Sequence, residues 1–255
     1  MENLSVTIIT KNEEKNIGRC LASLKWADEI VVVDTNSTDR TVEICRQHTE
    51  QIFSESWHGY GKQKNICAMH AKNRWILNID ADEVVTSASA EEIQKVLKEG
   101  PQYPVYQFPR KNYFGDRWVR FGGWYPDQIL RLYNKEKVAF SESRVHERLV
   151  PDENAGSLKN ALMHYSYCNR EDYIQRQDRY STLYAQEKRA IGFRANWTHI
   201  YLRPPFNFFK NFILKQGFRE GSLGFFLAKS SAIYTYQKYA KTTSESLPPF
   251  KRQGI

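Results

Sequence analysis

The sequence predicts an α/β protein with a mainly parallel sheet flanked by helices, followed by a helical C-terminal extension. Strand-like apolar runs alternate with amphipathic helical stretches up to about residue 80, which is the pattern of a doubly wound sheet. Beyond about residue 165 the pattern becomes helical again. A chain of 255 residues is long enough for one large α/β domain with a buried core, or for that domain plus a smaller appendage.

The N-terminal elements follow from their apolar patterns. Residues 29–34 (EIVVVD) contain a near-continuous apolar run, as expected of a parallel strand covered on both faces. Strands are predicted at 4–10, 29–34, 51–56 and 75–80. Helices are predicted between them, at 12–27, 37–48 and 61–72. Ser37 or Thr38 is expected to cap the second helix.

The middle of the chain changes character. A capped helix is predicted over 86–100, where Gly100 and then Pro101 end it. Between 103 and 150 the pattern indicates antiparallel strands joined by turns. We therefore divide the chain into a first domain, residues 1–165, with halves at 1–100 and 101–165, and a helical extension over 166–255.

Composition limits the class of protein. Lys and Arg total 37 against 29 Asp and Glu, a formal charge of +8, so an anionic partner is expected. Charge alone does not choose between nucleic acid, phosphorylated metabolites and an acidic membrane surface. The four cysteines are far apart, without a CxxC pair, and are expected to be reduced core residues. No uncharged apolar stretch reaches 18 residues, which favours a cytosolic protein.

Polar side chains follow three of the predicted strands. Thr10 ends the first strand and Lys11 follows it, Asp34 ends the second, and Asp80 ends the fourth with Asp82 two residues later. In an open α/β sheet, ligands bind outside the carboxyl ends of the strands. Residues i and i+2 of an extended segment project to the same side, so Asp80 and Asp82 can face one ligand, either Mg²⁺ or Mn²⁺ on a diphosphate or ribose hydroxyls. The alternative is a solvated turn, because Asp is common where strands end.

Four segments, in this order and spacing, resemble the family 2 glycosyltransferases, which have a GT-A fold. They are TIITKNEEKNIGRCLASL, EIVVVDTNSTDRT, GKQKNICAMHA and NIDADE, which together cover roughly residues 4–85. The resemblance implies that residues 1–100 bind a nucleotide-sugar and that residues 101–165 bind the acceptor. It also implies that Thr10, Lys11 and Glu13 border the nucleobase and that Asp34 recognises the base or ribose. Many relatives carry Tyr in place of Lys11.

The same resemblance assigns the rest of the donor site. Asp80 belongs to the ribose side, with Ala81 beside it, and Asp82 holds the divalent metal. Lys64 directly precedes Asn65, where the family often has a basic residue that faces the diphosphate. Glu83 is expected only to shape the turn.

The second half must supply the acceptor site and a catalytic base. An inverting sugar transfer needs a carboxylate that removes the proton of the attacking hydroxyl. In FGGWYPDQILRLY, Asp127 follows an aromatic loop and occupies the place of the family's catalytic Asp, although PDQ replaces the more frequent acidic pair. A turn-capping Asp is the alternative. The reserve candidate for the base is Glu147. His146 is a candidate metal ligand, and the candidate acceptor contacts are Trp124, Arg131 and Arg144.

The PDQILRL…VHE arrangement is similar to that of the WaaE/KdtX-like lipopolysaccharide core transferases, which add glucose to heptose. The resemblance implies a UDP-sugar donor and an inner-core acceptor. Another acceptor (a lipid phosphate, another glycan or a protein) and a non-catalytic nucleotide- or RNA-binding protein are the alternatives. No RNP, KH or zinc-finger pattern supports nucleic-acid binding. Aromatic residues interleaved with Lys and Arg over 204–241 indicate either contact with a membrane interface or ordinary helix packing. The resemblance implies that such a membrane would be the inner face of the bacterial inner membrane.

Overall fold

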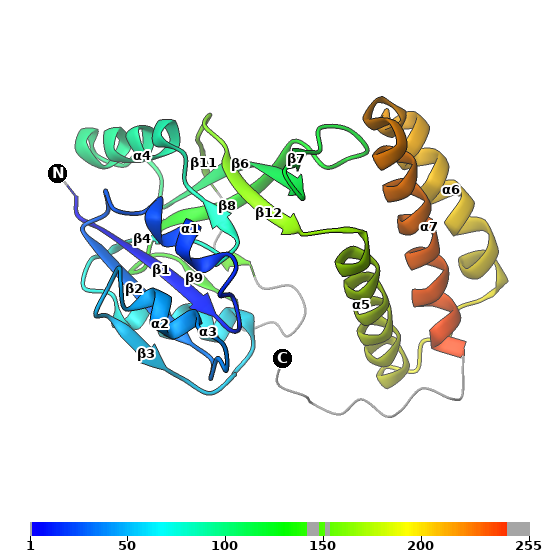
Figure 1. The fold of residues 1–255 in the computed structure, drawn as a ribbon, viewed down its shortest axis with the longest axis horizontal. Helices are drawn as coiled ribbons and strands as arrows, with labels where there is room; N and C mark the ends of the chain where they lie inside the picture. The colour runs from blue at the N-terminus through cyan, green and yellow to red at the C-terminus, as the bar shows by residue number, and fades with distance from the viewer. Residues whose placement is uncertain (1, 142–147, 151–153, 244–255) are drawn as a thin grey trace. The chain divides into compact units, whose positions relative to one another are not determined.

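A computed structural model describes residues 2–141, 148–150 and 154–243 (Figure 1). These residues form two compact units. The first unit runs to Arg110 and resumes over Asp127–His164, and the second contains Lys111–Pro126 and the residues from Tyr165 onward. The chain passes between the units after Arg110, after Pro126 and after His164, so residues 111–126 group with the C-terminal residues.

The sheet of the first unit begins with four parallel strands. Their order is β3 (Ile52–Ser54), β2 (Glu29–Asp34), β1 (Leu4–Thr10) and β4 (Trp75–Asn78). The sheet continues through β8 (Asp127–Asn134), β6 (Val105–Phe114), β12 (Leu162–Tyr167) and β5 (Glu83–Val84). β8 is antiparallel to both β4 and β6, as the sequence predicted for this region. The short strands β7, β9, β10 and β11 span Arg117–Trp118, Ala139–Phe140, Leu149–Val150 and Gly156–Ser157.

Helices cover both faces of this sheet, which confirms the predicted fold class. On one face lie α1 (Ile17–Ala22), α2 (Thr41–Cys45) and α4 (Ser87–Glu99), whose buried side chains join those of β1 and β4 in one core. On the other face, α3 (Tyr60–His70) packs with Val31, Val33 and Ile76 in a second core. All four residues of β4 are buried, because both faces of this central strand are covered.

Two helices begin later than the sequence predicted. α1 starts at Ile17 because the preceding residues bind the loop after β2. The Asn12 side chain accepts a hydrogen bond from the Thr38 N–H, and the Asn12 backbone N–H donates to Ser37 Oγ. α2 starts at Thr41, so Ser37 and Thr38 do not cap it. By contrast, α4 is capped by Thr86 and followed by Gly100 at φ 90°, as expected.

The second unit is mainly helical, as predicted for the C-terminal extension. It contains α5 (Arg170–Ala190), the π-helical segment η1 (Thr198–Leu202), α6 (Arg203–Phe209), the π-helical segment η2 (Lys210–Leu214), the short η3 (Gly217–Glu220) and α7 (Gly221–Thr243). Its core brings Val119 against Tyr173, Leu223 and Leu227. Within the described part of the chain, no helix is long and apolar enough to cross a membrane.

All four cysteines are free thiols, but they differ in accessibility. Cys20, Cys45 and Cys67 are buried as expected, whereas Cys168, also expected in the core, is exposed because it follows β12 immediately before α5. Burial raises the pKa of Cys45 and of Cys67 to about 12, and it raises that of Cys20 well above its ordinary value.

We therefore expect one thiol per native chain to react with a thiol-specific chromogenic disulfide at pH 8, because the reaction needs an accessible thiolate. Absorbance of the released chromophore measures the number, and the denatured chain should release four equivalents. Cys168→Ser should abolish the rapid native reaction. Rapid reaction of a second native thiol would contradict the burial described here.

Candidate active site

The carboxyl ends of β1, β2 and β4 adjoin one another at one edge of the sheet. Thr10 pairs with Asp34 in the β1–β2 register, and Thr7 pairs with Asn78 two residues before Asp80. Asp34 is buried and accepts from the Ser37 N–H at 2.8 Å and from the Ser37 hydroxyl at 2.5 Å. Thr10 Oγ1 is buried and has no hydrogen-bond partner among the described residues. This edge therefore presents a fixed carboxylate beside a hydroxyl.

Asp80 lies between two cations. Lys64 Nζ is 3.2 Å from Asp80 Oδ1, and Arg131 Nη2 donates to Asp80 Oδ2. Burial alone would raise the pKa of Asp80, but the Arg131 and Lys64 cations hold it well below its usual range. Because the side chain remains 32% exposed, this carboxylate is paired and also accessible.

Glu83 is the centre of a buried charge network. Its side chain is 0% exposed, and Oε1 accepts from Arg131 Nη2 at 2.6 Å and from Arg110 Nη1 at 3.1 Å. Its second oxygen accepts from the Asp80 N–H at 3.1 Å, so Glu83 also shapes the turn, as expected from the sequence. Burial would lower the pKa of Arg131, but Asp80 and Glu83 raise it above its ordinary value.

The network extends to Asp127. Arg110 of β6 is the cross-strand partner of Asp127 of β8, and its Nε and Nη2 donate to Asp127 Oδ2 at 2.9 and 2.8 Å. The same guanidinium binds Glu83, so Arg110 links the turn after β4 to the candidate base. Asp127 remains 35% exposed.

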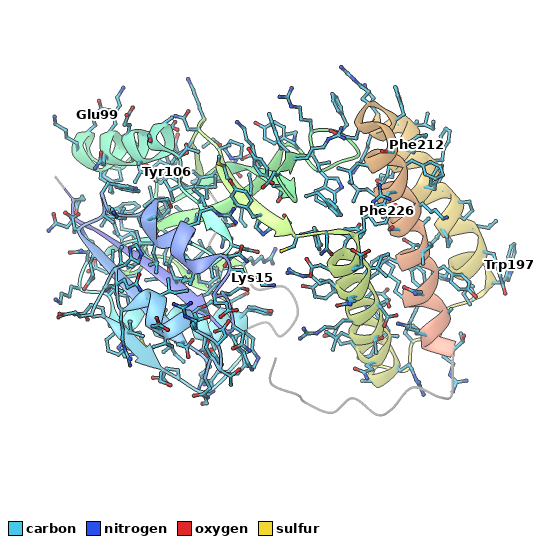
Figure 2. The ribbon with its side chains drawn as sticks, viewed as in Figure 1. Lys15, Glu99, Tyr106, Trp197, Phe212 and Phe226 are labelled. Atoms are coloured by element: carbon cyan, nitrogen blue, oxygen red, sulfur yellow. The ribbon has the colours of Figure 1, made fainter. Side chains whose placement is uncertain are left out.

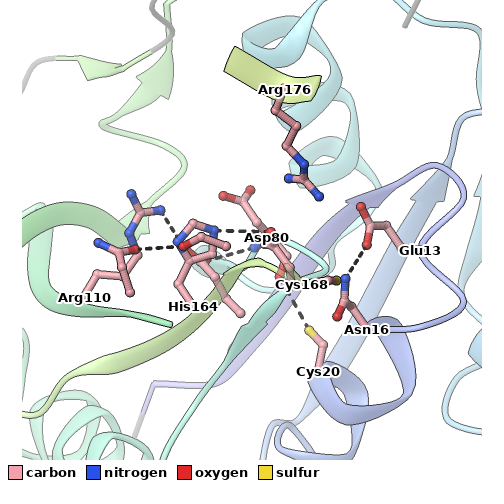
Figure 3. Close-up of polar contacts among 12 residues, drawn as sticks. Glu13, Asn16, Cys20, Asp80, Arg110, His164, Cys168 and Arg176 are labelled. Carbon is pink, nitrogen blue, oxygen red and sulfur yellow. Dashed lines mark hydrogen bonds and ion pairs between the residues drawn. The ribbon is translucent and has the colours of Figure 1, made fainter. Parts of the chain in front are cut away.

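Asp82 is paired with His164, a residue that the sequence analysis missed. His164 Nε2 lies 3.2 Å from Asp82 Oδ2, and both side chains are about one-fifth exposed. The two come together because β12 pairs with β5, where His164 is opposite Glu83. Figure 3 shows His164 in the same close-up as Asp80 and Arg110. A single His in a strand of mixed residues gave no local signal for this contact.

A carboxylate and an imidazole fit a divalent cation as a partial ligand set. Among the described residues, no group of three acidic, His or Cys side chains could hold a metal by itself. Mg²⁺ is usually held by one or two protein carboxylates together with substrate phosphates, so this small set is compatible with a metal that arrives with a diphosphate.

The other predicted residues occupy different positions. Glu13 accepts from the Asn16 side chain at 2.9 Å (Figure 3), Lys11 is exposed, and Ala81 is buried. In the second unit, Trp124 packs against Tyr167 and Tyr173. The predictions for Arg144, His146 and Glu147 lie outside the described residues.

Arg131 has a location that differs from the expected acceptor contact. Its side chain is only 2% exposed, and its guanidinium is held by Asp80, Glu83 and, at 3.3 Å, Asn78 Oδ1. An acceptor outside the sheet would not reach a group buried in this way. Arg131 therefore supports the carboxylates instead of forming part of an acceptor surface.

The chain belongs to glycosyl transferase family 2, whose sequence model matches residues 5–233. It is 30% identical to the lipopolysaccharide core biosynthesis glycosyltransferase LpsC of Rhizobium meliloti (strain 1021), over 93% of this chain and 91% of that protein. An uncharacterized glycosyltransferase of Rickettsia felis is 32% identical, over 94% and 88% of the two chains. Among solved structures, TarS of S. aureus is 18% identical with a TM-score of 0.48, over 86% of this chain and 46% of that one.

Glu83→Gln should lower the free energy of unfolding by about 3 kcal/mol, because it removes the buried anion that compensates two guanidinium groups. The exposed Glu99, in a surface pair with Lys95, provides a matched control, and Glu99→Gln should change stability by no more than about 0.5 kcal/mol. Urea unfolding measures both values. Equal stability of the two variants would contradict the network.

The depressed pKa of Asp80 predicts how its contribution depends on pH. An Asp whose folded pKa is lowered stabilises the protein fully above its unfolded value of about 3.9, and the contribution disappears as the pH falls toward the folded value. The difference in unfolding free energy between the parent and Asp80→Asn should therefore be constant from pH 7 to about pH 5 and narrow below about pH 4. Urea unfolding at several pH values tests this, and a difference that widened in acid would contradict it.

Proposed function

We propose that this glycosyltransferase moves a hexose from a UDP-sugar to a heptose of the lipopolysaccharide inner core, with inversion at the anomeric carbon. Glucose is the hexose that the resemblance to the core transferases implies. The observation that carries the proposal is the convergence of Asp34, Asp80 and Asp82 at the carboxyl ends of adjoining strands, with Asp127 tied to the same turn through Arg110. Family membership and the similarity to a lipopolysaccharide core transferase support it.

In the proposed donor site, Asp34 and Thr10 recognise the nucleoside. A fixed carboxylate accepts hydrogen bonds from ribose hydroxyls or from the uracil N–H, and Ser37 holds that carboxylate in place. Lys11 and Glu13 border the base, and Asp80 and Ala81 lie on the ribose side. Lys64, already directed at Asp80, places a positive charge toward the diphosphate.

Asp82 and His164 would hold Mg²⁺ or Mn²⁺. When bound, the ion neutralises the diphosphate charge that grows as UDP departs. His164 is the imidazole beside Asp82. His146 is kept as a further candidate metal ligand.

Asp127 is the proposed base. It takes the proton of the acceptor hydroxyl while that oxygen bonds to the anomeric carbon, and the bond from this carbon to the phosphate oxygen breaks on the opposite face, releasing UDP. Arg110 orients the carboxylate through two hydrogen bonds to one oxygen. Glu147 is kept as the reserve candidate, and Trp124 and Arg144 as acceptor contacts.

The enzyme would act in the cytoplasm, at the inner face of the bacterial inner membrane, where an anionic surface presents the acceptor. A transferase of the same family acting on a lipid phosphate, another glycan or a protein is the second candidate, and the same donor residues serve it. A non-catalytic nucleotide- or RNA-binding protein would not require Asp127.

Release of UDP from a panel of UDP-sugars, with Mn²⁺ or Mg²⁺ and a heptose-containing acceptor, tests the proposal. Asp127→Asn should reduce transfer by about 10²- to 10⁴-fold and leave UDP affinity unchanged, because only the proton acceptor is lost. Asp82→Asn should abolish metal-dependent UDP binding, measured by calorimetry. Asp116→Asn, at an exposed position in the segment before Asp127, is the control and should behave as the parent. Parental turnover by Asp127→Asn would overturn the mechanism.

A further inference from the structure

The second unit carries a long row of exposed apolar side chains. The segments η1, α6 and η2 follow one another without a break, and seven large side chains on and just before them are 43–64% exposed. We name these the aromatic ridge: Trp197, Tyr201, Leu202, Phe206, Phe209, Ile213 and Leu214. Apolar side chains gathered in this way mark interaction surfaces.

The opposite side of the same segment packs against α7, so the ridge residues are not needed for packing against that helix. Asn207 donates to Ser231 and Thr235 of α7, and Phe208 and Phe212 contact the Phe225 ring. Figure 2 shows Trp197 pointing away from the helices of this unit. The sequence left packing and membrane contact as alternatives. Packing accounts for the face that carries Asn207, Phe208 and Phe212, and it leaves the exposed face without an explanation.

The Lys, Arg, Asp and Glu residues within the segment that carries the ridge have one sign of charge. Residues 191–219 contain five Lys and Arg residues and no Asp or Glu. All five, Arg194, Arg203, Lys210, Lys215 and Arg219, are exposed. A two-fold contact between copies of this chain would place these cations against each other, which disfavours self-association. An anionic lipid surface complements both the cations and the aromatic rings, which favour the headgroup region.

We propose that the aromatic ridge docks on the surface of an anionic lipid bilayer. The rings insert at headgroup level, and the five cations bind lipid phosphates. Docking would give the proposed function a defined membrane-contacting surface, and it rests on that function only for the reason why docking is useful.

The residues directly after the ridge are hydrogen-bonded to the loop that leads into Asp127. The Gly122 N–H donates to Lys215 O at 2.8 Å, directly after η2. Glu220 of η3 accepts from the N–H groups of Arg120 at 2.7 Å and Phe121 at 3.1 Å. Docking would therefore fix the aromatic acceptor loop at the membrane together with the ridge.

Co-sedimentation of the full chain with vesicles tests the proposal. The parent should pellet with phosphatidylcholine vesicles that contain phosphatidylglycerol, and remain in solution with phosphatidylcholine alone. Phe206→Ser with Phe209→Ser should weaken binding about tenfold or more, because two interfacial rings are lost. Ile174→Ser, at an exposed apolar position on α5, should bind as the parent. Lys210→Glu should also weaken binding. This variant provides the test if circular dichroism shows that the double variant does not fold.

Equal binding to both vesicle types, or parental binding by the folded ridge variants, would overturn the proposal. Concentration-dependent dimerisation that the ridge variants abolish would assign the surface to a second copy and would also overturn it. Measuring sugar transfer to a soluble acceptor tests the proposed function separately from vesicle binding. A parent that transfers sugar without binding vesicles refutes docking alone, and one that binds vesicles without transferring sugar refutes only the function.

Discussion

The buried carboxylate of Glu83 is the constraint on which the candidate site depends. An anion with no exposed surface is tolerated only when cations compensate it, and here Arg131 and Arg110 both do so. Each guanidinium reaches a second carboxylate, Asp80 for Arg131 and Asp127 for Arg110. The turn after β4 and the strands β6 and β8 are therefore held in one arrangement, because moving any of them would leave a buried charge without its partner.

The acidic residues of the candidate site differ in their partners. Asp80, Glu83 and Asp127 are tied to arginines, whereas Asp82 of the same turn faces an imidazole. Asp80 and Asp127 keep about a third of their side-chain surface exposed, so the network orients them without enclosing them. A site that is positioned before a ligand arrives does not have to reorganise its charges during reaction, which is the general advantage of a preorganised polar site.

The local sequence pattern was sufficient to predict the positions of the central strands and the edge of the sheet where the carboxylates lie. The apolar runs predicted β1, β2 and β4 almost to the residue, and the polar residues after them predicted the edge where the carboxylates gather. The contacts of Arg131 and His164 could not be predicted in this way, since each depends on which strands are neighbours in the sheet, 51 residues apart in one case (Arg131 to Asp80). The late starts of α1 and α2 have the same origin, because the loops after β1 and β2 bind each other.

The central claim is that the strand-end carboxylates form the donor site. Anomalous diffraction from crystals grown with UDP and Mn²⁺ tests it most directly, because manganese can be located independently of the protein. We expect one manganese position between Asp82 and the diphosphate, with His164 beside it and the uracil next to Asp34. Manganese or UDP bound away from Asp82 would show that these carboxylates do not form the donor site.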